Sequence, residues 1–433
     1  MGIGHGIAAI ANPPDNDSWQ DLNTSVLDLM ASHRYREAWQ VCEAALNEFP
    51  SNVQLVVNAG AILTHLGRPA EAELYMARAA ALQPDSPVIW NNLGCCLRNL
   101  NRIPESIECF DHAIRLDPRR ARAHYDRAFS LLLSGDYPNG FREYEHRWET
   151  YGMRRPGDRD PAMRARLWRG QDIAGKRLLV YAEQGLGDSI QFLRYIPVLE
   201  SRGAHVILEM QPPLRGLAQW LNADCEVGTG NPFLEFDYHC PLMTLPCILG
   251  TTLESIPPPA TFSVPDEACE RWRAFVPRDG LKNVGIVWAG NPENPMDDRR
   301  STELSTFQPL LKNERLRIFS FQVGPRAREL SNFRGIVDLA PKLTAVTETA
   351  AALLQMDLIV TVDTLVAHLA ASLGREVWIL LAFAPDWRWL LEREDSPWYP
   401  TVRLFRQPSP GNWPAVSGAL ELISQRNSVV LQL

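Results

Sequence analysis

The strongest constraint on the fold is a 34-residue period that runs through residues 19–152. Small residues and prolines recur in register, at Ala38, Ala72 and Ser106, at Ala45, Ala79 and Ala113, and at Pro50, Pro84 and Pro118. Gly60 and Gly94 share the same spacing. Small residues let two helices cross closely, and a proline ends the second helix before the next unit stacks. The period therefore predicts an array of stacked helical pairs.

The unit at residues 88–118 resembles the tetratricopeptide pattern, with matches at Trp90, Leu93, Gly94, Ser106, Phe110, Ala113 and Pro118. Three units agree with one another. A fourth begins at Ala121 but departs from the pattern, because Gly140 and Arg147 occupy its small-residue positions. We expect residues 141–150 to cap the array and join it to the C-terminal part of the chain. Arrays of this kind present a concave surface that binds peptides, which predicts a protein partner in the groove.

After residue 177 the pattern changes to short apolar strands that alternate with helical stretches, which predicts a parallel α/β body. We expect two doubly wound, Rossmann-like halves that face each other across a cleft. The expected division is a flexible tail (1–18), the repeats (19–152), a linker (153–176), an acceptor-side half (177–276) and a nucleotide-sugar-binding half (281–433).

A strand, a glycine turn and a helix open the first half. Residues 178–181 read as a buried strand, and Gly185 and Gly187 form the turn that presents Asp188. A dinucleotide fingerprint requires a third glycine where this chain has Ile190. We therefore interpret the turn as presenting a carboxylate. The inner helix face is predicted at Ile190, Leu193, Ile196, Val198 and Leu199.

A second strand-to-helix turn lies at residues 357–374 in the second half. Asp363 and Thr364 are typical of a helix start, and the N-terminus of that helix would suit a diphosphate. Asp363 as a simple N-cap is the alternative. His368, one turn into the helix, would bond either a phosphate or a neighbouring carbonyl.

Two further segments of the second half have open interpretations. Arg299 and Arg300 lie in a loop at a strand end (289–304), where they would contact a departing phosphate or simply be solvated. The aromatic residues of 384–407 would form a stacking wall for a base or sugar, or pack in the interior. They are Trp387, Trp389, Trp398 and Tyr399.

The segments 183–214, 290–301, 319–324, 362–370 and 386–407 together resemble bacterial tetratricopeptide-repeat proteins with a C-terminal glycosyltransferase domain. That domain is similar to the heptosyltransferase family, glycosyltransferase family nine, and the layout is similar to that of protein O-GlcNAc transferases and flagellin glycosyltransferases. The resemblance implies a GT-B fold and an inverting, metal-independent transfer of a hexosyl or heptosyl unit from a nucleotide-sugar. A protein docked on the repeats is the implied acceptor, and a lipopolysaccharide is the alternative.

The resemblance also implies roles for individual residues. Asp188 is the implied catalytic base, and Gln184 and Gln191 lie on the acceptor side. Donor binding is implied for Gly187, Asn291, Arg300, Ser301, Gln322, Asp363, Thr364, Val366, Ala367 and His368. The chain departs from its relatives at Asn294, where many have histidine, and at Ala371, where a glycine is common. Because of these departures an alternative function stays open, that of a repeat scaffold whose transferase body is inactive.

Composition excludes several other classes. A net charge of -8 and a pI near 5.7 do not favour nucleic-acid binding, and we interpret the arginine-rich stretch 154–169 as a solvated linker. The 8 cysteines contain no C-x-x-C pair, no apolar run reaches the ~20 residues of a membrane span, and no signal peptide is evident, so a cytoplasmic protein is expected. The Asp-x-Asp pairs at 15–17 and 158–160 lie outside the α/β body, so we predict no metal and no cofactor beyond the nucleotide-sugar.

Overall fold

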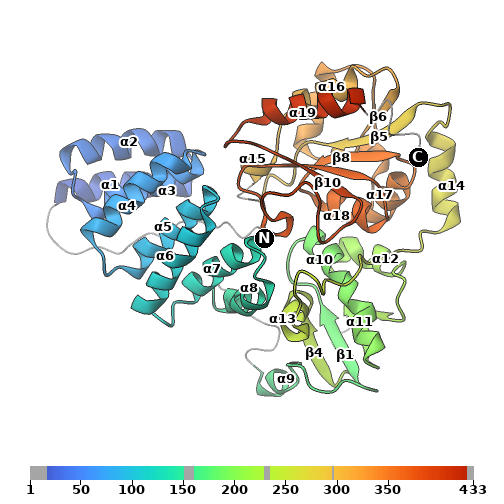
Figure 1. The fold of residues 1–433 in the computed structure, drawn as a ribbon, viewed down its shortest axis with the longest axis horizontal. Helices are drawn as coiled ribbons and strands as arrows, with labels where there is room; N and C mark the ends of the chain where they lie inside the picture. Colours follow the sequence, from blue (N-terminus) through green and yellow to red (C-terminus); the bar gives the residue numbers. More distant parts are fainter. Residues whose placement is uncertain (1–16, 151–159, 229–234, 295–296, 427–433) are drawn as a thin grey trace.

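The structure is a computed structural model that describes residues 17–150, 160–228, 235–294 and 297–426. A helical array lies beside an α/β body that contains two sheets (Figure 1). This confirms the predicted combination of a helical repeat array and a two-part α/β body. The expected tail up to residue 16 and three linker arginines (Arg154, Arg155, Arg159) lie outside the described residues.

Four helical pairs form the described part of the array. They are α1 (Asp17–Ala31) with α2 (Tyr35–Glu48), α3 (Val53–His65) with α4 (Pro69–Leu82), α5 (Pro87–Asn99) with α6 (Ile103–Leu116), and α7 (Ala121–Leu133) with α8 (Tyr137–Tyr144). A Cβ added at Gly94 would lie 2.8 Å from the Phe110 ring, and one at Gly60 would lie 2.6 Å from the Met76 side chain. The recurring glycines therefore allow the two helices of a unit to touch.

The fourth unit folds like the others although its sequence departs from the pattern. Gly140 packs against Leu132, where an added Cβ would lie 2.7 Å from the leucine side chain. The second helix is short, and it continues into a 3-10 turn, η1 (Glu145–Glu149). Arg147 on this turn is fully buried because it faces the α/β body.

The first sheet has the order β3-β2-β1-β4, and all its strands are parallel. They are β1 (Arg177–Tyr181), β2 (His205–Glu209), β3 (Glu226–Val227) and β4 (Tyr238–Pro241). The preceding segment is more structured than a linker: it contains α9 (Pro161–Ala165), Leu167 bridges to His239 beside the sheet, and Trp168 is buried. The remaining elements are α10 (Leu186–Phe192), η2 (Leu193–Tyr195), α11 (Ile196–Ser201), η3 (Pro212–Leu214), α12 (Arg215–Ala218), η4 (Leu242–Thr244) and α13 (Leu245–Leu249).

The single helix predicted after the Asp188 turn is divided into α10, η2 and α11. Pro197 lies in the first turn of α11, and its missing N–H prevents one continuous α-helix. The predicted inner face is nevertheless buried at Ile190, Leu193, Ile196 and Leu199, whereas Val198 is only partly buried.

The second sheet has the order β10-β9-β8-β5-β6-β7 and is also parallel. Its strands are β5 (Lys282–Val287), β6 (Leu316–Ser320), β7 (Ile336–Asp338), β8 (Leu358–Val362), β9 (Val377–Leu381) and β10 (Val402–Arg406). Helices and 3-10 turns surround it: α14 (Asp266–Phe275), α15 (Asp297–Arg300), η5 (Leu304–Phe307), α16 (Gln308–Leu311), η6 (Pro325–Asn332), η7 (Ala340–Lys342), α17 (Val346–Leu353), α18 (Leu365–Ser372), η8 (Trp387–Trp389) and α19 (Trp413–Arg426). The sequence patterns did not predict β3, β7 or β10.

The largest apolar core joins all three parts of the molecule. It includes Tyr137 and Tyr144 of the array, β1 and α10 of the first half, and α18 and Trp398 of the second half. The aromatic residues 387, 389, 398 and 399 are all at most 2% exposed. The interior interpretation of these aromatics is therefore right, and the stacking wall is wrong. No helix among the described residues is long and apolar enough to cross a membrane.

Candidate active site

Asp188 lies in the first turn of α10, at the carboxyl end of β1. Its Oδ2 accepts the backbone N–H of Gly185 at 2.9 Å, and its Oδ1 accepts a hydrogen bond from Arg388 Nη2 at 2.5 Å. A quarter of the side chain is exposed. The turn thus presents a carboxylate as predicted, and both oxygens of this carboxylate accept hydrogen bonds.

Arg388 contacts several residues of this site, and its side chain is only 7% exposed. Besides Asp188 it contacts Gln191 Oε1 at 2.6 Å through Nε and Asp386 Oδ1 at 2.8 Å through Nη1. Burial by itself lowers the pKa of Arg388, but the carboxylates of Asp386 and Asp188 raise that pKa above its usual range. The guanidinium therefore stays charged and links the two halves. Sequence reasoning missed this role, because the pattern around Arg388 is dominated by aromatic residues.

The N-terminal turns of α10 and α18 are in direct contact (Figure 1). A Cβ added at Gly187 would lie 2.9 Å from His368 Cδ2 and 3.6 Å from the Leu365 backbone. At this point the two halves touch and are not separated by the expected cleft. Gly187 therefore serves the approach of the two helices, which differs from the donor contact implied by the resemblance.

His368 is 4% exposed, in the second turn of α18. Its Nδ1 lies 3.1 Å from Tyr399 Oη, and its ring is stacked on Trp389 at a centroid distance of 5.5 Å. Burial lowers the pKa of His368 well below its usual value, and the charges of Arg388, Arg194 and Arg300 lower it further. The imidazole is therefore neutral, and its Nε2 lies 3.8 Å from Asp363 Oδ1.

Asp363 is not the N-cap of α18. Thr364 occupies that position, where its side chain makes no capping hydrogen bond. Burial raises the pKa of Asp363 to about 6, and the charge of Asp386 contributes in the same direction. The charges of Arg300 and Arg388 counteract the rise. A carboxyl that titrates near neutrality therefore lies beside the start of α18.

The loop that carries Arg300 is held together by polar contacts. Gly290 N–H donates to Ser301 Oγ at 3.0 Å, and that hydroxyl donates to Asp297 Oδ2 at 2.9 Å. Arg300 Nε donates to Asp297 Oδ1 at 3.0 Å, and about a quarter of the Arg300 side chain is exposed. Arg300 acts electrostatically on both Asp363 and His368. The loop after β5 and the start of α18 therefore converge, as their positions at strand ends predict.

Several residues expected to bind the donor instead support the loops. Gln322 is buried; its Oε1 accepts the N–H groups of Trp288 and Ala289, and its Nε2 donates to the Ala289 carbonyl. Asn291 Oδ1 accepts the Glu293 N–H, and Thr364 Oγ1 lies 3.1 Å from Thr361 Oγ1. Val366 and Ala367 are buried.

The two acceptor-side glutamines are also structural supports. Gln184 Oε1 accepts the Tyr144 hydroxyl at 2.9 Å, and the Gln184 carbonyl accepts Gln211 Nε2 at 2.7 Å. Gln191 is fully buried against Arg388. These contacts help to position the Asp188 turn.

The repeat array contacts both halves of the body near this site. Arg147 contacts Glu183 Oε1 at 3.0 Å and Thr244 Oγ1 at 2.7 Å in the first half. Burial raises the pKa of Glu183 to about 7, although Arg147 opposes that rise. On the second half, Arg299 Nη2 donates to the Thr64 carbonyl of α3 at 3.0 Å. Arg299 therefore docks the donor-side loop on the array and is not solvated.

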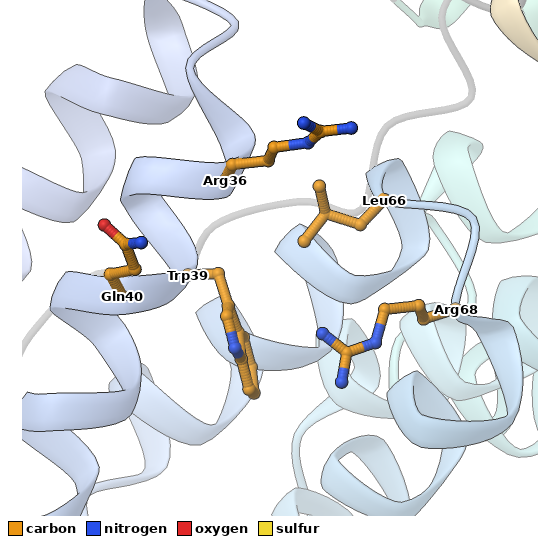
Figure 2. Close-up of a pocket in the computed structure, with 5 residues that line it drawn as sticks. All are labelled: Arg36, Trp39, Gln40, Leu66 and Arg68. Carbon is orange, nitrogen blue, oxygen red and sulfur yellow. The ribbon is translucent and has the colours of Figure 1, made fainter.

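The array also has a depression on its surface. Its lining residues come from α2 and from the turn between α3 and α4, and Figure 2 shows them: Arg36, Trp39, Gln40, Leu66 and Arg68. The Arg68 guanidinium lies 5.2 Å from the Trp39 ring centroid, and Arg36 is exposed. The depression thus combines an aromatic face with positive charge.

Comparison with known families supports both parts of the chain. Residues 29–94 and 87–120 match tetratricopeptide repeat models, and residues 324–382 match glycosyltransferase family 9 (heptosyltransferase). The family 9 match includes Asp363, Thr364 and His368, whereas Asp188 and Arg388 lie outside it.

Individual proteins are similar to different parts of the chain. Protein FlbA of Caulobacter vibrioides is 26% identical over 437 residues, which is 85% of this chain and 72% of that protein. The peroxisomal targeting signal receptor of Eremothecium gossypii is 37% identical over 94 residues, 22% of this chain and 16% of that receptor. A glycosyltransferase family 9 structure from Veillonella parvula is 11% identical with a TM-score of 0.43, covering 55% of this chain and 88% of that one. The chain is thus similar to tetratricopeptide repeats in its helical array and to glycosyltransferase family 9 over part of its second half, and this similarity supports glycosyltransferase activity.

Proposed function

We propose that the chain transfers a sugar from a nucleotide-sugar to a protein acceptor, with inversion at the anomeric carbon and without a metal ion. One observation carries the proposal. Arg388 of the second half binds the Asp188 carboxylate of the first half, next to the start of α18. A carboxylate base and a cationic, helix-end site are thereby brought together across the two sheets.

Asp188 is the proposed general base. Each carboxylate oxygen carries two lone pairs, so Oδ1 can accept an acceptor hydroxyl while it stays bonded to Arg388. Removal of the hydroxyl proton makes the acceptor oxygen nucleophilic. A single displacement by that oxygen, with departure of the nucleoside diphosphate, inverts the anomeric carbon.

The leaving diphosphate needs positive charge. Arg300 is partly exposed and close enough to act on Asp363 and His368. The N-terminus of α18 supplies oriented N–H groups and the positive end of its dipole. We propose that these groups replace a metal ion in stabilising the diphosphate, and that neutral His368 orients this end of the helix.

The array is the proposed acceptor-docking element. Tetratricopeptide arrays typically bind peptides, and the depression at Trp39 offers an aromatic face beside exposed Arg36. An acidic or polar segment of an acceptor protein fits this chemistry. The rigid contacts of Arg147 and Arg299 would hold such a segment at a constant position relative to Asp188.

An inactive scaffold is the second candidate. It is favoured by the two hydrogen bonds that occupy both Asp188 oxygens, and by Asn294 where many relatives have histidine. The two candidates differ in one measurable property, because only the transferase turns over a nucleotide-sugar.

A panel of nucleoside diphosphates and nucleotide-sugars tests the choice by thermal shift and by diphosphate release. The transferase should be stabilised by one nucleotide and should hydrolyse the matching nucleotide-sugar slowly without an acceptor. Asp188→Asn should keep the thermal shift and lose about a hundredfold of the release rate. If a nucleotide stabilises both the wild type and Asp188→Asn but neither protein releases diphosphate, the result would support the inactive scaffold.

The acceptor is tested separately with radiolabelled donor in a cell extract that is divided into protein and lipid fractions. Label should enter protein. Arg36→Glu should reduce that transfer while leaving diphosphate release unchanged, whereas the control Arg119→Glu, on another exposed part of the array, should change neither. Label in the lipid fraction would favour a lipopolysaccharide-type acceptor.

A further inference from the structure

We propose that His124, Glu143 and His146 form a binding site for a zinc-type divalent cation at the end of the repeat array. The three residues each offer one ligand atom, and these atoms lie within 4.8 Å of one another. Its ligands do not include Asp188 or Asp363, and it would play no part in the transfer reaction. Its role would be to fasten α7 to α8 and η1.

Local structure places the ligands on facing helices. His124 is in the first turn of α7. Glu143 lies near the end of α8, and His146 follows three residues later on η1, which continues the helix. Residues three apart on a helix share a face, so this pair points toward His124. The pattern is a Glu-x-x-His pair completed by a histidine from the neighbouring helix.

The hydrogen bonds of His124 match those of a metal ligand. Its Nε2 lies 3.1 Å from the Pro118 carbonyl, and its Nδ1 lies 2.7 Å from Glu143 Oε2. Both partners are acceptors, so without a metal only a protonated imidazolium satisfies both. A cation between Nδ1 and Oε2 would replace that proton. His124 would then donate Nε2–H to a backbone carbonyl, the usual outer contact of a metal-binding histidine.

His146 supplies the second nitrogen. Its ring is stacked on His124 at a centroid distance of 4.2 Å. Its Nδ1 is buried and, within the described residues, makes no hydrogen bond; Glu149 Oε1 is 3.9 Å away. This nitrogen is therefore available as a metal ligand.

Glu143 completes the set and is itself held in place. Its Oε1 accepts Arg127 Nη2 at 2.8 Å, and Arg127 also pairs with Asp111. This leaves Oε2 directed at His124. Two imidazoles and one carboxylate are typical of zinc, with a water as fourth ligand, and not of calcium or magnesium. Tetrahedral zinc needs ligand atoms about 3.3 Å apart, which side-chain rotation would achieve here.

The experiment uses the full, untagged chain after chelator treatment and dialysis. Zn²⁺ is titrated by calorimetry, and Co²⁺ is used as a spectroscopic probe of tetrahedral coordination. We expect one equivalent of Zn²⁺ to bind with micromolar or tighter affinity. This affinity should decrease as the pH falls, because the histidines protonate. His146→Ala and Glu143→Gln should each weaken binding by about a hundredfold or more, since each removes one of three protein ligands.

His112→Ala is the matched control, because His112 is a histidine of the neighbouring helix α6 that lies outside the ligand set. Circular dichroism checks that each variant is folded. Glu143→Gln retains the length of the side chain, so the proposal stays testable if a histidine variant unfolds. Absence of saturable Zn²⁺ binding to the wild type, or equal affinity in wild type and folded Glu143→Gln, would overturn the proposal.

Discussion

Arg388 and Asp188, 200 residues apart in the chain, form a 2.5 Å hydrogen-bonded ion pair that connects the two halves of the α/β body. The same guanidinium holds Gln191 and Asp386. A buried charge with three partners is expensive to disrupt, because each partner loses its compensation. The geometry of the proposed base thus depends on a residue of the opposite half.

Replacing Arg388 with lysine should impair both stability and turnover. One ammonium cannot span three acceptors, so the variant should lose about 3 kcal/mol of stability, visible as a lower thermal midpoint. The rate of diphosphate release should decrease as well. Arg393→Lys is the control, because Arg393 pairs only locally with Asp395 at the surface. Equal midpoints for the two variants would show that the buried pair contributes nothing.

Gly187→Ala should separate α10 from α18. The new methyl would lie 2.9 Å from His368 Cδ2, closer than van der Waals contact allows. We expect a loss of about 1–3 kcal/mol, typical of overpacking, and a weaker thermal shift with the cognate nucleotide. Gly418→Ala serves as the control, since nothing lies within 4 Å of its added Cβ, and alanine at this exposed position of α19 should be neutral or stabilising. An equally stable Gly187→Ala protein would contradict the contact.

Asp363→Asn should change how stability depends on pH. The pKa of Asp363 is raised to about 6 in the folded protein. At a pH between the ordinary pKa of an aspartate and 6, the folded state therefore binds more protons than the unfolded state. Ionised Asp363 therefore destabilises the fold above about pH 6, and this penalty fades as the pH falls through 6 toward 4. The asparagine variant should melt above wild type at pH 7.5 and close to it at pH 4.5. A difference that does not vary with pH would contradict a raised pKa.

Arg147→Met should weaken the attachment of the array. It leaves Glu183, 7% exposed, without its main partner, and a buried unpaired carboxylate costs about 3–5 kcal/mol. The double variant Arg147→Met with Glu183→Gln should recover much of this loss, because the more deeply buried carboxylate is removed. The other partner of Arg147, Glu145, is 22% exposed and keeps its hydrogen bond from Thr244. Arg142→Met, at an exposed position of α8, is the control. Differential scanning calorimetry measures these variants together with the single variant Glu183→Gln and the wild type, and additive single effects in the double variant would argue against the pair.

The sequence alone determined the architecture, because repeating and alternating patterns are local properties of a chain. The 34-residue period marked helices that cross at Gly60 and Gly94, and β1, β5 and β8 were evident as apolar runs. Asp188 was located by its glycine turn, and the start of α18 by the strand before it. In both turns, a buried strand leads directly into a helix, which constrains where the turn residues lie.

Only the tertiary structure determined which residues contact those two turns. Gln184, Gln191 and Gln322, which are predicted near substrate, each bind a residue of a distant segment. No periodicity reports that Arg388 reaches Asp188, or that Arg147 and Arg299 bind the array to the body. Such contacts follow from the packing of three separate parts around one apolar core, and the relative placement of those parts is a property that no local pattern encodes.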